Sequence, residues 1–103
     1  MRLTPEQIAM LKEAASEYFG ADASVLLFGS RVDDSKRGGD IDLLVCPGPD
    51  ARDQIFSRRI RLLTRLERML GERKIDVVIE MPQDSRPIVA VAHATGVKLG
   101  QHS

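Results

Sequence analysis

The chain has 103 residues, 43% of them hydrophobic, and its 15 lysines and arginines balance 15 aspartates and glutamates to a formal net charge of zero. These values predict one domain over residues 1–103 with its own core, and they argue against a disordered chain and a general nucleic-acid binder. The single cysteine excludes an internal disulfide framework and a multi-cysteine metal site. We expect a soluble, cytoplasmic protein, because no apolar run approaches the roughly 20 residues of a membrane span and no signal peptide opens the chain.

The first two elements have clear local signals. Thr4 is typical of a helix cap, Pro5 of the first helical position, and Gln7 completes a capping box. Apolar residues then recur at helical spacing until Gly20, which ends the predicted helix. Residues 24–28 form a short apolar run that predicts a strand.

The middle of the chain alternates between a loop, a strand and a long helix. Residues 30–39 have no periodicity and predict a loop, after which residues 40–45 predict a second strand. Asp50 can cap a long helix that Gly71 ends. The predicted apolar face of this helix consists of Ile55, Phe56, Ile60, Leu63, Leu66, Met69 and Leu70.

The last third of the chain predicts one more strand and one more helix. Residues 74–80 read as a strand, residues 85–87 open a helix that ends at Gly96, and residues 97–99 form a short extended piece. The fold class that follows is α/β or α+β, with a small mixed sheet of three to four strands flanked by helices.

Acidic residues on two of the predicted strands carry the chemistry. Side chains alternate along a strand, so Asp40 and Asp42 share one face of an otherwise apolar segment. Like charges at such a position repel, and a divalent cation would neutralise them. If the next strand is a sheet neighbour, Asp76 completes a cluster of three carboxylates. Hard oxygen ligands of this kind suit Mg²⁺ or Mn²⁺.

The end of the first strand supplies the residue types that bind phosphate. Gly29 permits close approach of the backbone, Ser30 offers a hydroxyl and an amide, and Arg31 adds positive charge. Lys36 and Arg37 lie on the loop that leads back to the acidic pair. Phosphate donors beside metal-binding carboxylates predict a site for a nucleoside triphosphate and a metal, arranged for in-line attack on phosphorus.

These segments together resemble a known signature. Residues 28–31, the glycines at 38 and 39 and the strand at 40–45 resemble the motif of the DNA polymerase beta-like nucleotidyltransferases, and more narrowly the minimal nucleotidyltransferases, called MNT proteins. Residues 74–79 resemble the family's strand with the third carboxylate. The resemblance implies the fold of the polymerase beta-like core.

The resemblance also implies roles for individual residues. Gly29 and Ser30 would contact the triphosphate, and Asp40 and Asp42 would bind the metal ions. Asp76 would be a third ligand that helps to activate the acceptor hydroxyl. The implied enzyme transfers a nucleoside monophosphate, AMP from ATP by expectation, to a hydroxyl and releases pyrophosphate, as in EC 2.7.7.

The resemblance further implies a partner. Minimal nucleotidyltransferases are paired with HEPN-domain proteins in toxin–antitoxin systems, where the MNT protein is the antitoxin and transfers AMP to its partner. Because larger relatives carry a helical domain that grips the acceptor, we expect a partner chain or a second copy of this chain to complete the cleft. Two alternatives stay open: a non-catalytic antitoxin that neutralises its partner by docking, and a small-molecule nucleotidyltransferase of the aminoglycoside type.

The zero net charge conceals an uneven distribution. Residues 29–50 carry five acidic and three basic residues, whereas residues 52–74 carry eight basic and three acidic ones. The arginine-rich helix within residues 52–70 predicts a solvated face or a docking surface for an acidic partner, and contact with RNA stays open. Cys46 is expected to be a buried small apolar residue and His93 a packed or half-exposed helix residue. Since neither His93 nor His102 has a partner at ligand spacing, no zinc site is expected.

Overall fold

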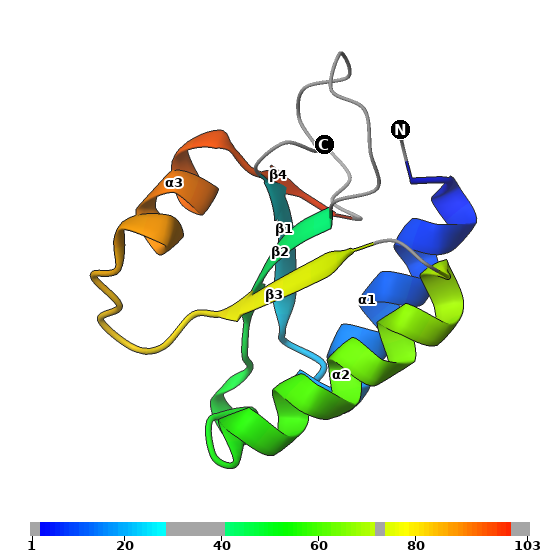
Figure 1. Ribbon diagram of the computed structural model, residues 1–103. Helices are drawn as coiled ribbons and strands as arrows, with labels where there is room; N and C mark the ends of the chain where they lie inside the picture. The colour runs from blue at the N-terminus through cyan, green and yellow to red at the C-terminus, as the bar shows by residue number, and fades with distance from the viewer. Residues whose placement is uncertain (1–2, 29–40, 72–73, 100–103) are drawn as a thin grey trace.

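The computed structural model describes residues 3–28, 41–71 and 74–99. Within these ranges the chain forms α1 (Pro5–Phe19), β1 (Ser24–Phe28), β2 (Ile41–Cys46), the short 3₁₀ turn η2 (Pro49–Ala51), α2 (Ile55–Leu70), β3 (Ile75–Ile79), α3 (Pro87–Thr95) and β4 (Val97–Lys98) (Figure 1). The predicted α+β class and the predicted order of elements are confirmed. No helix in the described ranges has the length and apolarity needed to cross a bilayer.

The four described strands form one mixed sheet in the order β3-β2-β1-β4. β2 and β3 run parallel and are joined by α2, whereas β1 is antiparallel to both of its neighbours. The helical connection is what a parallel pair needs, because a tight turn cannot join parallel strands. The first residues of β2 and β3 therefore lie at the same end of the sheet as the last residue of β1.

The two faces of the sheet are covered by different helices (Figure 1). Ile41, Leu43 and Val45 of β2 point to the face that packs on α1 and α2, and they belong to the main buried core. Leu44, from the opposite face, packs with Val89 and other side chains in a smaller core beneath α3. This alternation confirms the face assignment of the second strand for its described residues.

The capping signals of the first helix are confirmed. The Thr4 hydroxyl accepts a hydrogen bond from the backbone N–H of Gln7 at 3.0 Å, and the Gln7 side chain accepts one from the backbone N–H of Thr4 at 2.9 Å. At the other end Gly20 has a φ of 100°, which favours glycine. The helix is thereby fixed at both ends, with Phe19 at its end fully buried.

The start of the long helix differs from the prediction. Asp50 does not cap it: this residue lies in η2, and the helix cap is Gln54, which makes no side-chain capping bond. Tertiary contacts cause this later start of the helix. Ala51 is 3% exposed in the core, and the backbone N–H of Gly48 donates to the carbonyl of Phe19 at 2.8 Å, so this stretch is anchored to the end of α1. The helix begins only after that anchor.

The buried face of α2 is narrower than predicted. Leu62, Leu66 and Leu70 are its buried residues, one turn apart, and Leu62 was not among the residues expected. Phe56 and Ile60 are 76% and 44% exposed, so their placement on the core face was wrong. The apolar stripe in the sequence is wider than the surface that α1 and β3 cover. The remaining predicted members are buried or partly buried: Ile55, Leu63, Leu66, Met69 and Leu70.

Candidate functional site

Two of the predicted carboxylates lie on adjacent strands. The parallel register of β2 and β3 places Asp42 directly opposite Asp76. Both side chains share a sheet face with Leu44 and Val78, which pack beneath α3. Because neighbouring strands are about 4.8 Å apart, the two side chains project from adjacent positions of this face. Phe28, the last residue of β1, pairs with Asp42 on its other side.

The remaining predicted site residues lie outside the described residues. They are Gly29, Ser30, Arg31 and Asp40, together with the loop residues Lys36 and Arg37. Gly29 directly follows β1, and Asp40 directly precedes β2. Their roles in phosphate and metal binding therefore stay predictions.

An arginine that sequence reasoning missed lies beside Asp76. An Nη atom of Arg59 is 3.9 Å from Oδ1 of Asp76, and Nε of Arg59 donates to the backbone carbonyl of Val77 at 2.7 Å. The Asp76 side chain is 61% exposed. At this length the ion pair is loose, so Asp76 keeps oxygen atoms available to a ligand from solvent. No local pattern links positions 59 and 76, because α2 must pack on β3 before they meet.

A groove of about 560 Å³ runs beside Asp76. Its walls include the exposed apolar side chains of Phe56, Met81 and Ile88, contributed by α2, by the segment after β3 and by α3. Exposed apolar side chains gathered in a hollow are typical of a surface that binds another molecule. One carboxylate of the candidate site therefore borders a surface suited to a partner.

Other arginines of α2 bind to the protein itself. Arg58 donates to the backbone carbonyl of Tyr18 at 2.8 Å and pairs with Asp53 at 3.0 Å, and Arg65 pairs with Glu17 of α1. Part of the basic face therefore holds α2 in place on α1. The exposed arginines that a partner of this face would meet are Arg52, Arg61 and Arg68.

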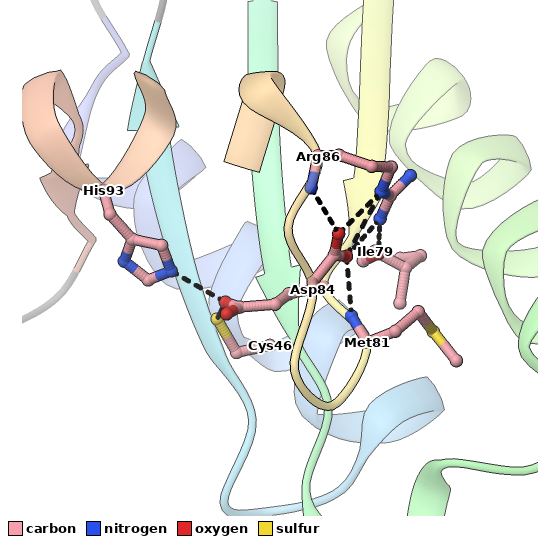
Figure 2. Close-up of polar contacts among 7 residues, drawn as sticks. Cys46, Ile79, Met81, Asp84, Arg86 and His93 are labelled. Atoms are coloured by element: carbon pink, nitrogen blue, oxygen red, sulfur yellow. Dashed lines mark hydrogen bonds and ion pairs between the residues drawn. The ribbon is translucent and has the colours of Figure 1, made fainter. Parts of the chain in front are cut away.

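A second polar cluster lies at the other end of the same sheet face (Figure 2). The Cys46 thiol donates to Oε1 of Glu80 at 2.9 Å, and Nε2 of His93 lies 2.8 Å from the same oxygen. Burial, and then the bond to Glu80, raise the pKa of Cys46 to about 11, while the bond from Cys46 lowers the pKa of Glu80. Two expectations are corrected here: Cys46 is only partly buried and bonds to Glu80, and His93, expected to have no ligand partner, meets Cys46 through the same Glu80 oxygen.

A tight turn between β3 and α3 adjoins this cluster (Figure 2). The Asp84 carboxylate accepts from the backbone N–H groups of Met81 and Arg86 at 3.0 and 3.1 Å, and from the Arg86 guanidinium. Arg86 also donates to the backbone carbonyl of Ile79 at 2.6 Å. The Arg86 side chain is the main cause that holds the pKa of Asp84 well below its ordinary value of 3.8.

We expect Asp84→Asn to destabilise the protein at neutral pH, because the charge that strengthens these bonds is lost. A carboxyl whose pKa is depressed by folding stabilises the fold above its unfolded pKa, and that contribution is lost as the pH falls through the folded pKa. The stability difference between wild type and variant should therefore be constant above about pH 5 and shrink below about pH 4. Urea unfolding across this range measures it; an equal difference at every pH would contradict it.

Comparison with known proteins adds one finding. A family model described as a nucleotidyltransferase domain matches residues 8–95. The match runs from the second turn of α1 to the end of α3 and so includes both aspartates of the candidate site. The search of curated proteins gives no match.

Proposed function

Because the chain belongs to the nucleotidyltransferase domain family, we propose that it transfers AMP from ATP, with Mg²⁺ or Mn²⁺, to a hydroxyl group of a partner protein. A nucleoside triphosphate as substrate and transfer of its monophosphate follow from the family. The observation that carries the finer proposal is the direct pairing of Asp42 with Asp76 on adjacent parallel strands.

The donor set fits a hard divalent cation. Two carboxylates side by side repel each other, and Asp76 is exposed enough for its oxygens to reach a metal–nucleotide complex. Asp40, which lies two positions before Asp42 in the sequence, is proposed to bind the same metal. The bound metal would neutralise the triphosphate and polarise the α-phosphorus. Asp40, Asp42 and Asp76 would hold it, with Asp42 in β2 and Asp76 opposite it in β3.

The proposed reaction balances around the α-phosphorus. An oxygen–phosphorus bond forms from the acceptor hydroxyl while the bond to the leaving pyrophosphate breaks. Asp76 takes the hydroxyl proton and passes it to solvent. Gly29 and Ser30 are proposed to hold the triphosphate through backbone N–H groups and a hydroxyl, and Arg31 to add positive charge.

The groove beside Asp76 supports a protein as the acceptor. Phe56, Met81 and Ile88 present apolar surface next to one of the proposed catalytic carboxylates, where a partner could bring a serine, threonine or tyrosine hydroxyl. We propose a HEPN-domain protein as this partner, with the present chain as its antitoxin. The same surface also supports the alternative in which docking alone neutralises the partner.

Transfer of radiolabel from ATP tests the proposal. The purified chain, Mg²⁺ and the protein encoded by the neighbouring gene should give a labelled partner from α-labelled ATP. No label should appear from γ-labelled ATP, because the γ-phosphate leaves with pyrophosphate. EDTA should abolish labelling, and excess Mg²⁺ or Mn²⁺ should restore it. The other three nucleoside triphosphates, tested as unlabelled competitors, report the base preference.

Two outcomes would overturn catalysis. One is the absence of label on any partner with either metal. The other is neutralisation of the partner without label, retained in Asp42→Ala, which would establish the docking module instead.

A further inference from the structure

Three different ligand atoms meet at the end of the sheet away from the paired aspartates (Figure 2). They are the sulfur of Cys46 at the end of β2, a carboxylate oxygen of Glu80 just after β3, and a ring nitrogen of His93 in α3. All three atoms lie within 4.8 Å of one another. Cys46 lies four residues beyond Asp42 at the end of β2, and Glu80 lies four residues beyond Asp76, one residue past the end of β3, so about 13 Å separates the two clusters.

The donor set differs in chemistry from that of the paired aspartates. Mg²⁺ prefers oxygen ligands only, whereas sulfur, imidazole nitrogen and carboxylate oxygen together suit a softer divalent ion, Zn²⁺ above all. We propose that Cys46, Glu80 and His93 form a zinc site, separate from the nucleotide–metal site, with water as the fourth ligand. The side chains of Glu80 and His93 are 27% and 50% exposed, which leaves room for that water.

Binding requires a modest rearrangement of the hydrogen bonds described above. Ligand atoms around tetrahedral zinc lie roughly 3.3–3.8 Å apart, while Oε1 of Glu80 lies 2.9 Å from the sulfur and 2.8 Å from the nitrogen. These two separations must therefore widen by roughly 0.4–1 Å when the ion binds. The Cys46 thiol gives up its proton to solvent, and a zinc–sulfur bond replaces the bond from that thiol to Glu80.

A metal accounts for this arrangement better than a reactive thiol does. In a nucleophilic pair the sulfur bonds to the histidine that takes its proton, whereas here the thiol donates to a carboxylate. Cys46 and Glu80 also line a hollow of about 240 Å³, which gives an ion a route from solvent.

The site would link α3 to the sheet. This helix has nine residues, and Val89 and Ala92 are its buried side chains. Zinc bound by Cys46 of β2, by Glu80 just after β3 and by His93 of α3 would attach the helix to the sheet through coordination bonds. We therefore expect zinc to raise the thermal unfolding midpoint of the metal-free protein, whereas EDTA should reverse the increase.

Cobalt substitution and zinc titration test the proposal. The protein stripped with EDTA should bind one Zn²⁺ per chain. With Co²⁺ it should show a thiolate-to-cobalt charge-transfer band, which can come only from Cys46 because the chain has one cysteine. Cys46→Ser and His93→Gln should each weaken zinc binding by at least about tenfold, and Cys46→Ser should abolish the band.

Matched variants serve as controls. His102→Gln removes the chain's other histidine, and Asp42→Asn alters the nucleotide–metal site; both should keep zinc affinity and the cobalt band unchanged. Circular dichroism without metal checks that each variant folds. A wild-type protein without the charge-transfer band, or zinc affinity unchanged in Cys46→Ser and His93→Gln, would overturn the site. Neither result bears on nucleotidyl transfer, because the two sites share no residue.

Discussion

Asp42→Asn is expected to lower the rate of nucleotidyl transfer by on the order of 10³-fold while the protein stays folded. The amide has nearly the shape of the carboxylate but no charge, so it cannot neutralise a cation. In the folded protein the change also removes the repulsion between Asp42 and Asp76, which face each other across β2 and β3. Circular dichroism checks that the variant is folded. Single-turnover labelling with α-labelled ATP measures the rate.

Two further variants show whether the loss depends on the position of the aspartate or only on the loss of one negative charge. Asp53→Asn alters an aspartate that pairs with Arg58 and has no place in the proposed chemistry, so the transfer rate should not change. Asp76→Asn should lower kcat with a smaller effect on the KM for ATP, if Asp76 takes the acceptor proton. An Asp42→Asn variant that keeps more than about a tenth of the wild-type rate would contradict the proposed metal ligand.

Phe19→Ala is expected to destabilise the protein by about 3–5 kcal/mol. Phe19 is 0% exposed at the end of α1 and belongs to the core between the sheet, α1 and α2. Its removal leaves a cavity that the anchored segment at Gly48 cannot easily close, because the backbone there is bonded to residue 19 itself. Domains of this size are stable by about 5–15 kcal/mol in total. Urea unfolding measures the loss directly.

Phe56→Ala is the matched control for Phe19→Ala. Phe56 is 76% exposed on α2, so its truncation should change stability by no more than about 0.5 kcal/mol. Because Phe56 lines the groove beside Asp76, the same variant should weaken binding to the partner protein. Equal destabilisation by the two variants would mean that α2 turns its other side to the core.

Local patterns predicted most of the fold because most elements have local causes. The capping box of Thr4 and Gln7 and the alternation along residues 41–45 depend on neighbours in the chain, and both are confirmed. The order of the strands in the sheet depends on contacts between residues far apart in the sequence, so local patterns do not predict it. The pairing of Asp42 with Asp76 was conditional on two strands being neighbours, and the register supplies that condition.

The errors arose where tertiary contacts override local preference. Asp50 has the side chain of a helix cap, but burial of Ala51 holds its segment in a 3₁₀ turn. Cys46 and His93 meet only through Glu80, and separations of 34 and 13 residues leave no spacing that a motif could reveal. The roles of the residues within 29–40 depend on the family resemblance.

The outer side of β3 has a consequence for how this protein meets other chains. β3 is an edge strand of the described sheet, and the carbonyls of Val77 and Ile79 on its outer side already accept bonds from Arg59 and Arg86. An incoming strand would have to displace both guanidinium groups before it could extend the sheet, so edge-to-edge pairing at β3 is disfavoured. A partner in the neighbouring groove must therefore bind by fitting side chains between α2 and α3, and its local secondary structure need not be extended.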